Sequence, residues 1–196
     1  VEQYLKDTLD PLPRGAVLIG DSDHRYFGFQ FARRVLGHRP DVRYVDLGLI
    51  GFDWYRRRVE ANLGVESGAD HGTTHLNVLV ENLMDEGDPV FVTHFVHPDL
   101  GDYFRLYPVG TAMRVLRRGE RAPGIAEVYE RNLALLGTLR IKPRPNSPKT
   151  SWNHLVLTNY GQIWQEMAEQ LAAAGFAKRA RKADQITSTL SPWLAK

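Results

Sequence analysis

The run from Ala16 to Gly20 constrains the fold more than any other part of the sequence. It is short, continuously apolar and bounded by turn-forming residues, which is typical of a strand buried on both faces of a sheet. Apolar residues then recur at helical spacing from Tyr26 to Leu36, and a second strand-like run covers Val42 to Ile50. A helix between two such strands indicates a crossover between parallel strands. We therefore expect an open, mainly parallel α/β sheet flanked by helices, of the Rossmann-like kind.

The same patterns predict the other elements of this sheet region. A helix is expected over 52–63, with Trp54, Tyr55 and Val59 toward the core. A further strand is expected from Tyr107 to Leu116, or a hairpin with its bend at Gly110. The remaining expected elements are helices over 4–12, 74–86, 100–104 and 125–139, and a strand over 89–93.

The C-terminal part of the chain changes in character after a Pro-rich segment. Two helix-forming runs on either side of Gly175 predict an αα-hairpin. Trp164, Gly175, Ala180 and Pro192 stand where a tetratricopeptide repeat favours such residues, and the alternative is an ordinary pair of C-terminal helices. We predict an α/β domain over 1–142, a Pro-rich linker over 143–149 and an αα-hairpin over 150–196.

Composition excludes several classes of function. The 25 Lys and Arg residues balance 23 Asp and Glu residues, so no concentrated basic field demands nucleic acid, and none is expected as a partner. The absence of cysteine excludes disulfides and thiolate chemistry. No segment reaches the roughly 20 apolar residues of a membrane-spanning helix. The chain begins at Val1 inside a helix-like run, as we would expect of a piece of a longer polypeptide.

A serine hydrolase is one alternative for the turn after the first strand. Gly20-Asp21-Ser22 is similar to the opening block of one lipase and esterase class, with Ser22 as nucleophile, and His97 resembles the histidine block of that class. In these enzymes an aspartate three residues before the histidine orients it, whereas here that residue is His94. We therefore predict no catalytic residue and expect Asp21 and Ser22 to begin the following helix.

Loop carboxylates and imidazoles offer a second alternative, a metal site. Their spacing matches no zinc signature, so we predict neither a metal nor a cofactor. The residues in question are Asp21, Asp23, His24, Asp70, His71, His75, His94, His97 and Asp99.

Short basic clusters are the third feature with possible chemistry. They are Arg33-Arg34, Arg56-Arg57-Arg58 and Arg117-Arg118. A phosphate or a lipid headgroup could use such clusters, and solvated arginines on helix faces are the alternative.

Several motifs occur in order along most of the chain. They are Leu12-Pro13-Arg14-Gly15, Gly20-Asp21-Ser22-Asp23, Arg39-Pro40-Asp41-Val42, Trp54-Tyr55, Asp88-Pro89-Val90 and Tyr103 to Pro108. This order resembles the soluble region after the membrane spans in the bacterial protein O-mannosyltransferase-like family, multi-span membrane proteins of the GT-C glycosyltransferase type. Two departures concern the acidic turn: Ser22 stands where asparagine is expected, and His24-Arg25-Tyr26 replaces a threonine-rich continuation.

The resemblance implies an accessory domain that performs no chemistry, because GT-C enzymes carry the catalytic carboxylate between membrane spans. It implies a place on the periplasmic face of the inner membrane. The implied partners are the membrane-embedded part of the parent protein and a protein or glycan acceptor. A structural interaction module using the C-terminal helices is a further alternative.

The predicted ligand site lies around the acidic turn, because open α/β sheets bind ligands at the carboxyl ends of their strands. Its candidate residues are Asp21, Ser22, Asp23, His24, Arg39, Asp41 and Trp54.

Overall fold

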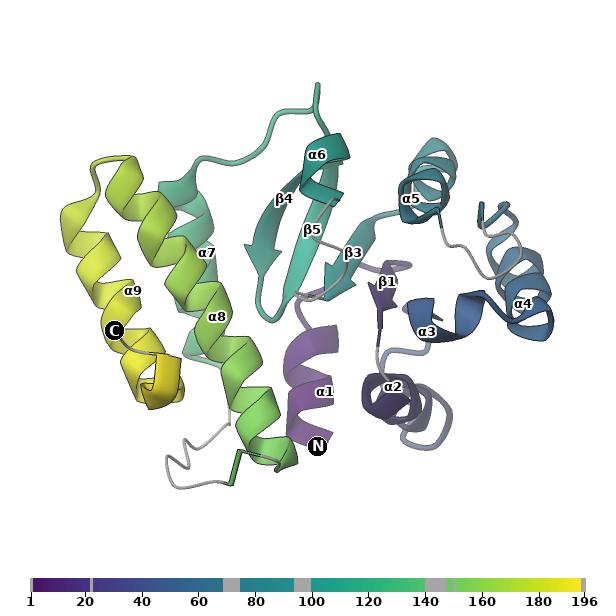
Figure 1. The fold of residues 1–196 in the computed structure, drawn as a ribbon, viewed down its shortest axis with the longest axis horizontal. Helices are drawn as coiled ribbons and strands as arrows, with labels where there is room; N and C mark the ends of the chain where they lie inside the picture. The colour runs from purple at the N-terminus through teal and green to yellow at the C-terminus, as the bar shows by residue number, and fades with distance from the viewer. Residues whose placement is uncertain are drawn as a thin grey trace. The chain divides into compact units, whose positions relative to one another are not determined.

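The computed structural model describes residues 2–21, 23–68, 75–93, 100–139, 148–149 and 151–194, without the side chains of 23–25. Helices and strands alternate through the first half of the chain, and helices alone make up its C-terminal part (Figure 1). In chain order the elements are α1 (Glu2–Leu9), β1 (Val17–Gly20), α2 (Asp23–Arg34), β2 (Arg43–Asp46), α3 (Leu47–Ile50), α4 (Asp53–Leu63), α5 (Leu76–Asp85), β3 (Val90–Thr93), α6 (Leu100–Tyr103), β4 (Phe104–Val109), β5 (Ala112–Arg117), α7 (Ile125–Leu136), α8 (Trp152–Ala173), α9 (Ala177–Leu190) and the short 3₁₀ helix η1 (Pro192–Leu194).

The five strands form one mixed sheet in the order β2-β1-β3-β5-β4. β1 pairs in parallel with β2 and with β3, so that Val17 faces Arg43 on one side and Val90 on the other. β5 runs antiparallel to β3, and Gly110 lies in the turn between β4 and β5 with a φ of +63°. The expected α/β class and the hairpin at Gly110 are therefore confirmed. The sheet is mixed rather than mainly parallel, because this hairpin adds antiparallel strands to the parallel β2-β1-β3 group, and the Rossmann-like character stays a prediction.

The core of the sheet region forms as the apolar runs predict. Val17, Leu18 and Ile19 are completely buried in β1. In α5 the buried residues Leu76, Leu79, Val80 and Leu83 follow the spacing of one helix face. Burial of such a face is what holds an amphipathic helix on a sheet.

The prediction was wrong in the second half of the Val42 to Ile50 run. β2 ends at Asp46, and 47–50 form helix α3 instead of continuing the strand. Asp46 causes the change, because its carboxylate accepts a hydrogen bond from the Leu49 backbone amide at 3.2 Å and so caps the helix.

The expected burial of Trp54 was also wrong. Its side chain is 58% exposed, although Tyr55 and Val59 on the same helix are buried as predicted. On α2 the apolar residues are divided: Phe29 and Ala32 are buried, whereas Phe27 and Phe31 are exposed. An apolar residue on these helices is therefore not by itself a core residue.

The chain forms two compact units. The first consists of 1–11, 108–111 and 121–196, and the second of 12–107 and 112–120. α8 and α9 pack closely in the first unit, so the expected C-terminal helical hairpin is confirmed. Its tetratricopeptide-like character and the predicted domain boundaries stay predictions, and 140–147 of the linker region lie outside the described residues.

Candidate functional site

The acidic turn begins where the sequence places it, directly after β1. Asp21 is exposed there. The chain leaves β1 for β2 on one side and later adds β3 on the other side, so Asp21 stands at the switch point of the parallel strands. Asp23 and His24 are the first residues of α2, but their side chains are not described. Ser22 lies outside the described residues, as do His94, His97 and Asp99, and the hydrolase alternative stays a prediction.

Arg39 and Asp41 lie at the amino ends of the parallel strands, just before β2 begins, whereas Asp21 lies at the carboxyl ends. The Arg39 guanidinium donates from Nε and Nη2 to the two Asp41 carboxylate oxygens, both at 2.9 Å. It also donates to the backbone oxygens of Leu12 at 2.8 Å and Pro13 at 3.0 Å. Asp41 in turn accepts from the Gly15 amide at 3.1 Å. The pair therefore fastens the segment before β2 to the segment before β1.

The environment of Asp41 agrees with a structural role. Hydrogen bonds from Arg39 hold the pKa of this carboxyl well below its ordinary value, and the Gly15 amide acts in the same direction. Arg43 adds a second fastening close by, because it donates to the Gly15 backbone oxygen at 2.9 Å and forms an ion pair with Asp88. The motif segments around Gly15, Arg39 and Asp88 thus meet at the amino ends of the parallel strands.

Trp54 lies near the start of α4, which follows the carboxyl end of β2. Its ring contacts that of Tyr55 edge to face, at 5.5 Å between centroids. Trp54 and Asp21 therefore both follow carboxyl ends of strands. Arg39 and Asp41 are separated from them by the length of a four-residue strand, roughly 10 Å at about 3.3 Å per residue.

The metal alternative gains no support from the described residues, among which no group of three histidine or carboxylate side chains could hold an ion. This statement does not cover the side chains of Asp23 and His24, nor Asp70, His71, His94, His97 and Asp99, which lie outside the described residues.

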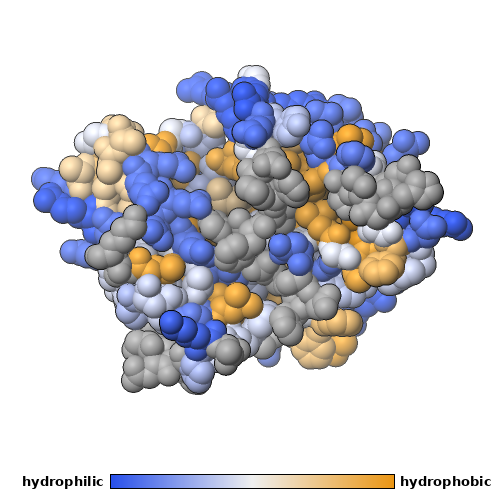
Figure 2. Space-filling view, viewed as in Figure 1, coloured by the Kyte–Doolittle hydropathy of each residue, from blue (hydrophilic) through white to orange (hydrophobic). Residues whose placement is uncertain are grey.

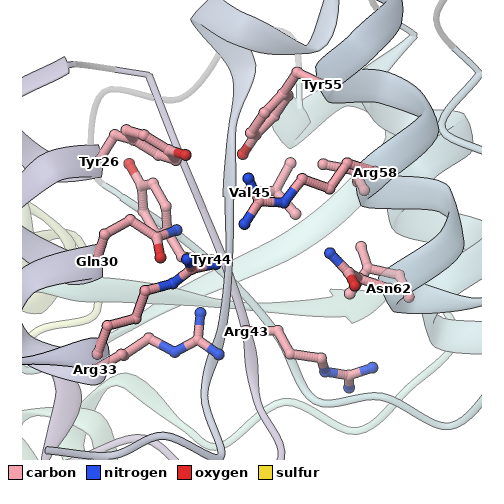
Figure 3. Close-up of a pocket in the computed structure, with 12 residues that line it drawn as sticks. Tyr26, Gln30, Arg33, Arg43, Tyr44, Val45, Tyr55, Arg58 and Asn62 are labelled. Atoms are coloured by element: carbon pink, nitrogen blue, oxygen red, sulfur yellow. The ribbon is translucent and has the colours of Figure 1, made fainter. Parts of the chain in front are cut away.

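A pocket of about 300 Å³ lies over β2, the edge strand of the sheet, between α2 and α4. Tyr26 and Gln30 extend from one side, and Tyr55, Arg58 and Asn62 extend from the other, with β2 between them (Figure 3). The residues that line it are Tyr26, Gln30, Arg33, Arg34, Arg43, Tyr44, Val45, Tyr55, Arg58, Val59, Asn62 and Leu63.

The charge of this pocket is strongly one-sided. Four of its lining residues are arginines, and none of the described lining residues is a carboxylate. Arg43 is neutralised by Asp88, whereas Arg34 and Arg58 form no ion pair with any residue that the structure describes. Like charges that line one pocket repel one another, so the pocket favours a bound anion.

Arg33 is destabilised in its charged form by burial and by the neighbouring arginines. Its Nη2 donates to the Pro40 backbone oxygen at 3.2 Å, but its buried Nε has no hydrogen-bond partner in the described part of the chain. Burial lowers the Arg33 pKa, the charges of Arg34 and Arg43 lower it further, and Asp41 opposes the shift. Because guanidinium groups stay protonated at neutral pH, these residues can bind an anion but cannot exchange protons with it.

Tyrosines form the end of the pocket nearest the carboxyl ends of the strands. The rings of Tyr26 and Tyr55 meet edge to face at 5.9 Å, and their hydroxyl groups face the same space (Figure 3). The Tyr55 hydroxyl accepts a hydrogen bond from the Asp46 amide at 2.8 Å. Burial raises the pKa of Tyr55 to about 12, and the nearby Asp46 carboxylate adds to the shift. Tyr55 is therefore a neutral hydrogen-bonding group at any physiological pH.

Two of the basic clusters in the sequence contribute arginines to this pocket, but the pocket itself was not predicted. Tyr26, Gln30 and Arg33 have the spacing of one helix face on α2, and Tyr55, Arg58 and Asn62 also share one face on α4. Two such polar and aromatic faces on consecutive crossover helices were the available signal. The faces of α2 and α4 line one pocket because both helices lie beside β2, and the position of β2 at the edge of the sheet cannot be read from the sequence.

Comparisons of the chain with protein-family models, with curated proteins and with solved structures found no match. Among the described helices, none is long and apolar enough to cross a bilayer. The assignment of a function therefore depends on the site geometry and on the motifs of the sequence.

Proposed function

We propose that this chain is a non-catalytic binding domain for an anionic ligand, and that it serves as the extracytoplasmic accessory domain of a membrane protein of the glycosyltransferase kind. The observation that carries the binding role is the pocket between α2 and α4, which gathers four arginines without a lining carboxylate among the described residues. A concave site with a few converging polar groups is the usual form of a ligand site.

The ordered motifs support the second half of the proposal. Their resemblance to the soluble region of the O-mannosyltransferase-like family suggests a membrane-embedded parent, with this domain on its periplasmic face. The pocket and the acidic turn are the two places where an acceptor or a partner would be recognised. The fastening by Arg39 and Asp41 gives two of the motif residues a structural purpose that needs no catalysis.

Titration calorimetry with inorganic phosphate and pyrophosphate tests the binding role. We expect binding that weakens as salt rises, because the interaction is electrostatic. Arg58→Gln should weaken it about tenfold, since one charge-assisted hydrogen bond contributes about 1.5 kcal/mol. Arg57→Gln is the matched control, because Arg57 is exposed on the same helix but does not line the pocket. Equal losses in the two variants, or no binding by the wild type, would contradict the proposal.

The complete open reading frame tests the membrane parent. Long apolar segments in the same polypeptide would support it, and a gene that encodes no such segment would remove it. If the parent exists, deletion of this domain should impair acceptor binding more than it impairs turnover of acceptor that is already bound.

A further inference from the structure

We propose that the exposed apolar face of α2 and the adjoining arginine pocket together bind the surface of an anionic phospholipid bilayer. This inference rests on the proposed function, because the pocket would take the lipid phosphate groups. It goes further by assigning the apolar face and the chemical source of the anion.

The apolar face consists of three residues at four-residue spacing. Phe27 is 68% exposed, Phe31 is 46% exposed and Val35 is 68% exposed. Single exposed apolar residues are ordinary on a protein surface, but Phe27 and Phe31 on α2 lie in line with Val35, the residue directly after the helix, and together form a strip. Figure 2 shows apolar side chains at the surface over α2, in the lower right of the view.

Helix geometry places this strip directly beside the pocket. At about 100° per residue, α2 has three neighbouring faces. Phe29 and Ala32 lie on the buried face. Tyr26, Gln30 and Arg33 lie on the pocket face, and Arg34 stands at the border between the pocket and the apolar strip. α2 therefore presents an apolar face bounded on the pocket side by cationic groups, as in helices that lie in a membrane interface.

Aromatic residues extend this surface toward α4. The rings of Phe27 and Tyr26 lie 5.4 Å apart, those of Tyr26 and Tyr55 lie 5.9 Å apart, and Trp54 continues the series. Trp54 and Phe52 are both more than half exposed. Tryptophan and tyrosine favour the headgroup region, where one end of the side chain is in an apolar and the other in a wet environment.

Charge complementarity decides between possible occupants. A neutral apolar partner would cover the strip but would leave Arg34 and Arg58 uncompensated. A soluble phosphate would fill the pocket but would leave Phe27 and Phe31 in water. A bilayer that contains phosphatidylglycerol provides phosphate groups for the arginines and, directly beneath them, an apolar phase for Phe27 and Phe31.

Vesicle co-sedimentation of the 196-residue chain tests the inference. We expect binding to vesicles of phosphatidylcholine with phosphatidylglycerol and at least about tenfold weaker binding to pure phosphatidylcholine, because a juxtamembrane arginine gains affinity only from anionic lipid. Tryptophan fluorescence should shift to shorter wavelength on binding, because the exposed Trp54 enters the interface. The double variant Phe27→Ser, Phe31→Ser should lose at least about tenfold in partitioning, since two large apolar side chains no longer enter the interface.

Two controls separate this proposal from the proposed function. Tyr103→Ser removes an exposed aromatic residue outside the surface and should leave vesicle binding unchanged. The double phenylalanine variant should still bind soluble glycerol 3-phosphate, which also shows that it is folded. Wild-type protein that binds glycerol 3-phosphate but no vesicles would overturn the membrane inference and leave the anion-binding role intact.

Two further outcomes would overturn the inference. One is equal binding to anionic and neutral vesicles. The other is a wild-type dimer that the double phenylalanine variant abolishes, because a second copy of the chain would then cover the apolar face.

Discussion

At the scale of single residues, Arg39 and Asp41 show how a polar pair can be structural although its residue types suggest a ligand site. Arg39 has a φ of +47°, an uncommon backbone conformation for a residue other than glycine. Its guanidinium compensates by binding a carboxylate and two backbone oxygens. Fastening of this kind orders the loops at the amino ends of β1 and β2.

Asp41→Asn should lower the free energy of unfolding by about 1 to 2 kcal/mol at neutral pH, because Arg39 and Gly15 then hydrogen-bond a neutral group. The folded-state pKa of Asp41 lies below its unfolded value. Its contribution is therefore complete above about pH 4 and is lost as the pH falls through the folded-state value. Urea unfolding at several pH values measures the difference, which should shrink in acid. Arg131→Gln, at an exposed pair, is the control, and a difference that grows in acid would contradict this account.

Tyr55→Phe should destabilise the protein by about 1 to 3 kcal/mol, because the buried Asp46 amide loses its acceptor. The folded-state pKa of Tyr55 is raised to about 12, above the ordinary value near 10. The tyrosine therefore contributes fully below about pH 10, and its contribution declines as the pH rises toward the folded-state value. Denaturant unfolding between neutral and alkaline pH checks this, with exposed Tyr103→Phe as control. If the difference in unfolding free energy between wild type and Tyr55→Phe stayed constant up to alkaline pH, this account of Tyr55 would be contradicted.

At the scale of elements, the contact between α8 and α9 depends on one position without a side chain. A Cβ at Gly161 would lie 2.5 Å from the Ser191 Cβ, and the Ser191 hydroxyl donates to the Leu157 backbone oxygen. The two helices and the segment after them can approach only because Gly161 leaves this space. A glycine inside a helix normally reduces its stability, so its presence here has a packing reason.

Gly161→Ala should lower stability by about 1 to 3 kcal/mol, because the clash outweighs the gain in helix propensity. Gly101→Ala is the matched control: Gly101 is also helical, but no atom of the described residues lies within 4 Å of its added Cβ. We expect that control to be neutral or slightly stabilising in thermal unfolding. A stabilised Gly161→Ala variant would show that the helices do not approach as closely as described.

At the scale of the whole molecule, the first unit is built from segments far apart in the chain. Tyr160 of α8 donates to the buried Asp7 of α1 at 2.8 Å, and Gln3 donates to the other Asp7 oxygen at 2.7 Å. Burial and the charge of Asp7 both raise the pKa of Tyr160, so the hydroxyl stays a donor. The start of the chain is thereby held to its C-terminal helices.

A double-mutant cycle with Asp7→Asn and Tyr160→Phe measures this link. We expect a coupling free energy of about 1 to 3 kcal/mol, because each single change leaves a buried polar group with one partner fewer. Strictly additive effects in chemical unfolding would mean that the two side chains do not interact in solution.

Much of the fold was predictable because local patterns agree with tertiary structure there. The predicted strand over Ala16 to Gly20 appears as β1 (Val17–Gly20), the helix expected over 52–63 appears as α4, and Gly110 forms the hairpin bend. The prediction failed where a single capping contact decided the outcome, as at Asp46, and where an apolar residue stayed exposed, as at Trp54. Residue types alone do not show which carboxylate will cap a helix or which apolar face will find a core.

The sequence by itself determined the α/β class, the helical C-terminal part and the presence of basic clusters, because composition and periodicity are local properties. Only the tertiary structure decided that Arg39 and Asp41 lie at the amino ends of the parallel strands and that Asp21 lies at their carboxyl ends. It also decided that arginines from α2 and α4 meet over β2. The physical reason is that a pocket depends on strand order, and strand order arises from contacts between residues that are distant in the chain.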